Sequence, residues 1–262
     1  MKRVIGVVSI LILAAGSWWV GSSSWLHERW YDLTKPKLPV AENVNLTNTT
    51  NTNTVTSNTN VAVVPIPTEK NLAVPFTTQA PGANWDADHE EFCEEAAVVM
   101  AGRFFAGQKF SSTADAESAL QAAKTWEVKN LGFYFDTTAA ETAEMARGLY
   151  GVTVALKTNP TITDIKQALA ENKLVIVPTA GRQLGNPNFK SPGPIYHNLV
   201  IRGFTKDGKF ITNDPGTRKG EAYVYDQSVI MTALHDWVPS GDRTKAANGD
   251  ATGQKVILII SQ

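Results

Sequence analysis

Three residues of the chain have the types and spacing for nucleophilic catalysis. Cys93 is the single cysteine among 262 residues and opens a segment with helical periodicity, while His197 and Asp214 lie on a predicted hairpin. A thiol in the first turn of a helix faces unpaired N–H groups and the positive end of the helix dipole, which favours the thiolate. A histidine can take the thiol proton, and a carboxylate can orient the imidazole. The residues therefore predict a thiol hydrolase.

Each of these residues also has a purely structural interpretation. A lone cysteine is often a small buried hydrophobic residue. His197 could be an ordinary strand histidine, and Asp214 could be a turn carboxylate ahead of Pro215. The combination of helix position, histidine and aspartate favours the catalytic interpretation.

Acidic residues crowd the sequence around the thiol, and repulsion by like charges would raise the pKa of Cys93 against the helix dipole. We interpret them as stabilising the start of the helix on a solvated face, in preference to a role in substrate selection. The residues concerned are Asp86, Asp88, Glu90, Glu91, Glu94 and Glu95.

His89 lies four residues before Cys93, a spacing that two metal ligands on one helix could have. The chain has no second cysteine and no His-Glu-x-x-His pattern, so a zinc site is disfavoured. We predict neither a metal nor a cofactor. His27 and His235 are expected to be structural or solvated.

Hydrophobic periodicity predicts helices before strands, which indicates an α+β fold and not an alternating βαβ chain. The helices are expected at Cys93–Phe105, Thr113–Lys124, Thr138–Tyr150 (closed by Gly151), Ile162–Glu171 (capped by Thr161) and Gln227–Trp237. The strands are expected at Leu174–Val177 (ended by Pro178), His197–Phe204, Lys209–Asn213, Glu221–Tyr225 and Lys255–Ile260. The long polar segment from Thr179 to Pro194 is expected to be a loop at the cleft, with Arg182 and Lys190 as candidate contacts.

The predicted hairpin sets the distance between His197 and Asp214. If Lys206-Asp207-Gly208 forms a three-residue loop with Gly208 left-handed, Asp214 pairs with Val200, because 205 + 209 = 200 + 214. His197 is then three residues further along, roughly 10 Å at ~3.3 Å per residue. Strand twist or a bulge at Gly203 would close that gap.

The amino-terminal part predicts three regions. Residues 1–24 contain Lys2 and Arg3 ahead of an apolar run, typical of a signal peptide or an uncleaved membrane anchor. Residues 25–71 include an Asn/Thr-rich stretch with the composition of a disordered tether. Residues 72–262 should form one folded domain outside the cytoplasm, membrane-anchored or secreted.

The net charge of −1 supplies no electrostatic argument for nucleic acid. One cysteine also excludes an internal disulfide.

Several ordered motifs resemble the papain-like peptidase domain of the bacteriocin-processing, double-glycine-leader type, above all its secreted stand-alone relatives. The resemblance covers about residues 72–262 and lies in Val74-Pro-Phe-Thr-Thr-Gln79, Trp85, Cys93-Glu-Glu-Ala, Tyr196-His197-Asn-Leu-Val and Asn213-Asp214-Pro215-Gly216. It implies a papain-like fold, with a central nucleophile helix followed by an antiparallel sheet. It also implies Cys93 as nucleophile, His197 as base, Asp214 as orienting acid and Gln79 as an oxyanion donor. Many relatives have Cys-Gly-Pro where this chain has Cys93-Glu94-Glu95.

The sequence thus predicts an exported cysteine peptidase or related amide hydrolase, acting on a peptide, protein or cell-wall peptide through an acyl-enzyme. Two alternatives remain: an acyltransferase with the same triad, and an inactive papain-like module that binds peptide or cell wall.

Overall fold

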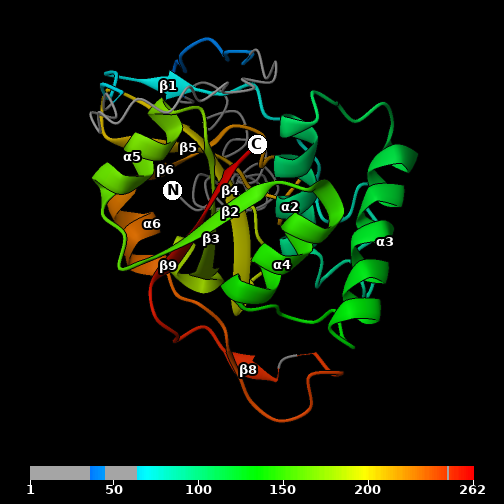
Figure 1. The fold of residues 1–262 in the computed structure, drawn as a ribbon. Coiled ribbons are helices and arrows are strands. Elements are labelled where there is room, and N and C mark those ends of the chain that lie inside the picture. Colours follow the sequence, from blue (N-terminus) through cyan, green and yellow to red (C-terminus); the bar gives the residue numbers. More distant parts are fainter. Residues whose placement is uncertain (1–35, 45–63, 247) are drawn as a thin grey trace, which may run out of the picture. The chain divides into compact units, whose positions relative to one another are not determined.

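The computed structural model describes residues 36–44, 64–246 and 248–262 (Figure 1). Its helices are α2 (Cys93–Phe105), α3 (Thr113–Asn130), α4 (Ala139–Tyr150), α5 (Ile162–Ala170) and α6 (Gln227–Ala233), with a short 3-10 helix η1 (Gly181–Leu184). Its strands are β1 (Lys70–Asn71), β2 (Thr153–Thr158), β3 (Leu174–Ala180), β4 (Tyr196–Phe204), β5 (Lys209–Asn213), β6 (Tyr223–Asp226), β7 (Val238–Pro239), β8 (Gly249–Asp250) and β9 (Val256–Ser261).

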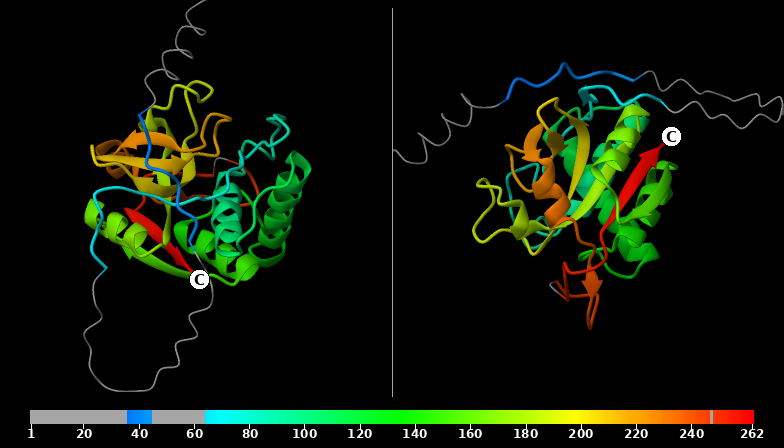
Figure 2. Two further views of the ribbon diagram at one scale, coloured as in Figure 1. Left: turned by 90° about the horizontal axis from the view of Figure 1, so that it is seen from above. Right: turned by 90° about the vertical axis from the view of Figure 1, so that its left-hand side faces the viewer.

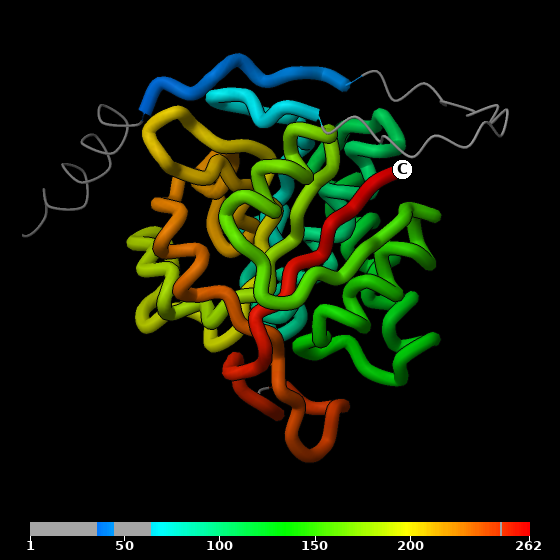
Figure 3. Tube along the Cα trace, turned by 60° about the vertical axis from the view of Figure 1, so that its left-hand side comes forward, coloured from blue at the N-terminus to red at the C-terminus, as the bar shows by residue number. Residues whose placement is uncertain are grey.

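An antiparallel sheet organises the domain, in the order β2-β9-β3-β4-β5-β6, with β1 added beside β4. Helix α2 packs on β4 and contacts both α3 and α4, whereas α5 packs on β3 and β4. Figure 2 shows α2, α3 and α4 (teal to green) gathered beside the sheet, and Figure 3 lets the red C-terminal strand β9 be followed alongside β2. The predicted α+β class, with a helix-rich first part and a largely antiparallel strand part, is confirmed.

Helix α2 is the central helix of the core. All of its residues except Arg103 are buried, as expected for a helix that is apolar nearly all round. Gly102 allows close packing on α4, because a Cβ there would lie 2.2 Å from the ring of Tyr150. The amino end of α2, which carries Cys93, is therefore held inside the protein.

The predicted helix starts agree with the structure because their signals are local. Thr138 and Glu141 form a capping box, and Gly151 ends α4 at a φ of 64°. Thr161 caps α5 in the same way with Asp164. Helix α3 continues to Asn130, beyond the predicted Lys124, and α6 stops at Ala233, before the predicted Trp237.

Two strand predictions need correction. Strand β3 continues through Pro178 to Ala180, although Pro178 was expected to end it. Its pairing with β9 stops at Ile176, so the proline lies where β3 no longer needs to donate to that neighbour. Strand β2 was missed because Val154 is its one buried residue, which leaves no alternating pattern to detect.

The β4–β5 hairpin has the expected loop and a bulge. The Thr205 N–H donates to the Lys209 carbonyl, and Gly208 has a φ of 83°, as predicted for a three-residue loop. The register then shifts between Ile201 and Gly203. Asn71 of β1 lies against the bulge at Gly203.

The amino-terminal predictions fall mostly outside the described residues, including the whole segment 1–24. Within residues 25–71, Glu42 exchanges backbone hydrogen bonds with Asn71 and Ala73, so this part of the predicted tether is ordered against the domain. No helix within residues 36–44, 64–246 and 248–262 combines the length and the apolar character that a membrane crossing requires.

Gly203→Ala should destabilise the domain. The added Cβ would lie 2.2 Å from the Lys70 carbonyl oxygen and 2.9 Å from the Cα of Asn71, where backbone must move. Overpacking of this kind costs about 1–3 kcal/mol, measured as the free energy of unfolding in urea. Gly82→Ala is the control, because its Cβ would meet nothing within 4 Å. An equal midpoint for both variants would contradict the expectation.

Candidate active site

His197 and Asp214 form a buried pair. Nε2 of His197 lies 2.8 Å from Oδ1 of Asp214, and the two side chains are 1% and 0% exposed. The bulge makes this possible: beyond it Val200 pairs with Asn213, where the unbulged hairpin would pair it with Asp214. The bulge therefore brings Asp214 one residue nearer to His197 along the strand, which shortens the predicted separation enough for the side chains to meet.

The Asp214 carboxylate accepts hydrogen bonds from further donors. The Gly216 N–H reaches Oδ1 at 3.0 Å, while the Asn186 amide and the Tyr225 hydroxyl reach Oδ2 at 3.0 Å and 2.6 Å. Burial by itself would raise the pKa of Asp214, but His197 and these donors outweigh burial and hold it below its ordinary value. The carboxylate is thus ionised and fixed in position.

The His197 ring is held on its other sides by packing. The Phe189 ring meets it edge-on, with 5.2 Å between the centroids. A Cβ on Gly216 would lie 2.9 Å from Cε1 of the imidazole, so glycine leaves the space that the ring occupies. With Nε2 bound to Asp214, Nδ1 is the nitrogen that can exchange a proton with a reacting group.

Cys93 lies at the first position of α2, against β4. The backbone N–H of Asn198, the residue after His197, lies close enough to its sulfur to favour the thiolate. The thiol itself donates to Oε2 of Glu94 at 2.9 Å. Burial raises the pKa of Cys93 well above its ordinary value and the ionised form of Glu94 would add to the rise, while the Asn198 N–H opposes it.

Gln79 joins two segments near the thiol. Its side-chain amide donates to the carbonyls of His89 (2.8 Å) and Glu90 (3.1 Å), and its backbone N–H donates to the carbonyl of Pro215 (3.0 Å). It thereby ties the residues before α2 to the turn after Asp214. Its role as an oxyanion donor remains a prediction.

The interpretation of the acidic residues as a solvated face is wrong for Glu94 and Glu95, which are 2% and 0% exposed. Helix α2 is covered on nearly every side, so its first turn goes into the core with it. Glu95 faces Glu127 of α3, also 0% exposed. Burial raises the pKa of both well above the ordinary range, and the Glu127 carboxyl raises that of Glu95 further. Asp86, by contrast, is exposed, as expected.

The metal interpretation of His89 gains no support. Its Nδ1 lies 2.7 Å from Asp86 and its Nε2 lies 2.9 Å from Glu117. Burial would lower the pKa of His89, but the hydrogen bonds with Glu117 and Asp86 raise it overall. Across the part of the chain that the structure describes, no group of three or more His, Cys, Asp or Glu could hold a metal ion. His235 binds the Gly253 carbonyl, and His27 lies outside the described residues.

The sequence did not identify Asn186, Phe189 and Tyr225 as neighbours of the site. Asn186 and Phe189 lie in the segment predicted as a functional loop, so its length was the available signal. Of its two candidate contacts, Arg182 donates to the Gly193 carbonyl and Lys190 pairs with Glu90 at 3.4 Å. Their role at the cleft stays a prediction.

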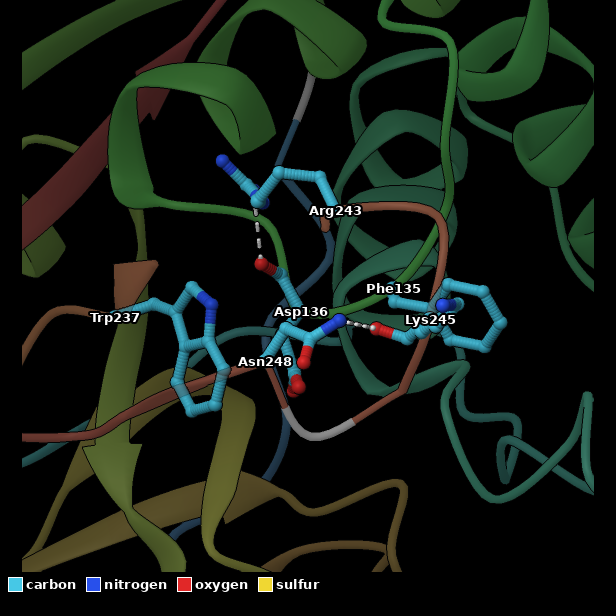
Figure 4. A pocket seen from close by; sticks show the side chains of 6 residues that line it. All are labelled: Phe135, Asp136, Trp237, Arg243, Lys245 and Asn248. Carbon is cyan, nitrogen blue, oxygen red and sulfur yellow. Dashed lines mark hydrogen bonds between the residues drawn. The ribbon is translucent and has the colours of Figure 1, made fainter. Parts of the chain in front are cut away.

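A small surface pocket lies between the segment before α4 and the residues around β7 and β8 (Figure 4). Its lining is Phe135, Asp136, Trp237, Arg243, Lys245 and Asn248. Arg243 donates to the Asp136 carbonyl at 3.2 Å. The next residue, Thr137, donates its N–H to Glu94 at 3.0 Å, which links this surface to the thiol.

The model of the Peptidase C39-like family matches residues 71–244, more than half of the chain. The matched range contains Gln79, Cys93, His197 and Asp214. Among solved structures, a candidate C39-like peptidase from Bacillus anthracis is similar at 13% identity and a TM-score of 0.42, covering 72% of this chain and 96% of that one. No curated protein matches.

Stability should fall as pH rises, because Glu95 and Glu127 bind protons more tightly in the folded state than in the unfolded state. Their stabilising protonation is complete below the ordinary value of 4.5 and is lost as pH climbs toward the raised values. In Glu95→Gln, the free energy of unfolding should decline less steeply between about pH 5 and 8, by up to ~1.4 kcal/mol per pH unit.

Urea unfolding at each pH measures this slope. Exposed Glu144→Gln is the matched control and should keep the wild-type slope. A wild-type slope in Glu95→Gln would show that the carboxyl is not held neutral by burial.

Proposed function

Since the chain belongs to the Peptidase C39-like family, we propose that it is a cysteine peptidase in which Cys93 attacks the peptide carbonyl. The observation that carries the proposal is the buried His197–Asp214 pair on β4 and β5, with the Cys93 sulfur beside Asn198 of the same strand. A nucleophile, a base and an orienting carboxylate are the groups that such acyl transfer needs.

The proposed reaction starts with proton transfer from the Cys93 thiol to Nδ1 of His197. The thiolate adds to the peptide carbonyl carbon, and the resulting oxyanion is stabilised by N–H groups at the start of α2. Gln79 is the proposed side-chain donor, and its amide would have to give up its bond to the His89 or Glu90 carbonyl to serve. The C–N bond then breaks as His197 protonates the leaving amine. Water, deprotonated by His197, attacks the thioester, releases the carboxylic acid and restores the thiol.

Asp214 acts through His197. Its Oδ1 accepts from Nε2 at 2.8 Å, which holds the proton on that nitrogen and leaves Nδ1 to take the thiol proton. The ionised carboxylate also stabilises the imidazolium that forms during the reaction. Asn186 and Tyr225 fix this carboxylate and complete the support of the base.

The substrate class follows from the chemistry and the predicted location. We propose a peptide, protein or cell-wall peptide that is encountered outside the cytoplasm, with the apolar run in residues 1–24 as export signal or anchor. The same acyl-enzyme could pass its acyl group to an amine instead of water. Product analysis with and without an added amine separates hydrolysis from acyl transfer.

One observation favours a second candidate, a peptide-binding module with a silent thiol. Cys93 is 5% exposed and donates to Glu94, and both features oppose thiolate formation. Failure of the wild-type thiol to react with any covalent probe in the native state would support this candidate.

Substitution of the triad tests the peptidase proposal. Cys93→Ala and His197→Ala should each lower kcat/KM for peptide cleavage by at least about 10³-fold, because each removes a group that takes part in bond making. Asp214→Asn should lower it by up to about 10⁴-fold, since an amide favours the wrong tautomer of the imidazole. Cleavage of a peptide library, followed by mass spectrometry, gives the rates.

Lys129→Ala on the exposed side of α3 is the control and should cleave as the wild type does. Full peptide cleavage by Cys93→Ala would exclude the proposed nucleophile. In that case the activity belongs to another group of the protein.

A further inference from the structure

Glu94 occupies a position that the triad does not explain. Its carboxyl group is 2% exposed and lies between the thiol and the backbone of the segment before α4. Oε2 is 2.9 Å from the Cys93 sulfur, and Oε1 accepts the Thr137 N–H at 3.0 Å. Both carboxyl oxygens are therefore engaged, each with a different partner.

Thr137 is itself held firmly, so the carboxyl has a fixed orientation. The Tyr196 hydroxyl donates to the Thr137 carbonyl at 3.0 Å, and the Thr137 hydroxyl lies 2.8 Å from that of Thr142. Tyr196 directly precedes His197 on β4. The element that carries the base thus also anchors the partner of Glu94.

The surroundings of Glu94 favour its neutral form. Burial raises the pKa of Glu94 well above its ordinary value, and Glu95 and Asp136 raise it further. Titratable groups of neighbouring elements interact with it, and those identified are carboxyls, a thiol and a phenol: Cys93 and Glu95 of α2, Glu127 of α3, Asp136 before α4, and Tyr196 of β4.

The two hydrogen bonds locate the proton of the neutral acid. An N–H group can only donate, so a proton on Oε1 would find no acceptor at Thr137, which favours the carbonyl form of this oxygen. A neutral carboxyl carries one proton, which is then placed on Oε2, the oxygen that faces the sulfur. Once the thiol has given up its own proton, this O–H points at the thiolate.

We propose that Glu94 is a positioning residue that works in its protonated form, donating a hydrogen bond from Oε2 to the Cys93 thiolate. The thiol proton goes to His197, and Glu94 keeps its own proton throughout the cycle, so no bond to Glu94 is made or broken. When Glu94 ionises at alkaline pH, repulsion replaces the hydrogen bond and the thiolate is disfavoured. This inference deepens the proposed function and rests on it.

Thiol titration tests the proposal without requiring peptide cleavage. The rate of Cys93 alkylation by iodoacetamide is measured against pH in the wild type, Glu94→Gln and Glu94→Leu. Leucine cannot donate a hydrogen bond, so the pKa of Cys93 in Glu94→Leu should rise by about one unit or more. Alkylation at neutral pH should then be about tenfold slower. Glutamine can present an N–H to the sulfur while its oxygen accepts from Thr137. Cys93 in Glu94→Gln should therefore react faster than in Glu94→Leu at neutral pH. It should also lack the loss of reactivity that ionisation of Glu94 causes in the wild type at alkaline pH.

The opposite shift would overturn the proposal. If Glu94 is an ionised acceptor, both substitutions remove a negative charge and lower the thiol pKa. Unchanged titration in both variants also contradicts it. Should Glu94→Leu fail to fold, Glu94→Gln decides alone, because a fall in its thiol pKa of one unit or more is incompatible with a neutral donor.

Glu95→Gln is the matched control. It lies on the same helix with the same burial, but it faces Glu127 and not the thiol. The pKa of Cys93 should shift less in Glu95→Gln than in Glu94→Leu. Failure of the peptidase proposal is distinguishable, because it appears as absent Cys93-dependent cleavage even when the titrations follow the expected order.

Discussion

The burial of the amino end of α2 against β4 is the constraint on which the site depends. It places the Cys93 sulfur beside the backbone of Asn198, one residue from the proposed base, and takes the first turn of the helix out of water. The same packing gives the thiol its neighbours and raises its pKa. For the proposed nucleophile, positioning and activation therefore have opposite requirements, because a buried thiol is well placed but poorly ionised.

The site contains two kinds of buried acid with opposite electrostatics. Asp214 is surrounded by hydrogen-bond donors and by His197, so its charge is compensated and its pKa falls. Glu94, Glu95 and Glu127 face one another and other acids, so burial favours their neutral forms. A protonated carboxyl can donate a hydrogen bond, which an ionised carboxylate cannot. The environment thus gives the same functional group two different roles within one site.

Local signals made most of the helices and the key hairpin predictable. The capping boxes at Thr138 and Thr161, and the left-handed Gly151 and Gly208, are set by a few adjacent residues. Strand β2 and the continuation of β3 through Pro178 were not predictable in this way. They depend on which strand lies alongside, and here β9 comes from about 100 residues further along the chain than β2.

The sequence by itself made Cys93, His197 and Asp214 the candidates for catalysis, and it determined the helix that begins at the thiol and the α+β order of elements, because residue type and short-range periodicity carry that information. Only the tertiary structure decided the bulge that brings Asp214 to His197 and the contacts of Asn186 and Tyr225. It also decided that Glu94 and Glu95 are buried. Six of the ten residues from Asp86 to Glu95 are acidic, a composition that predicts a solvated face. The packing of α3 and of the segment before α4 covers two of them, Glu94 and Glu95, because burial depends on neighbours in the fold and not on composition.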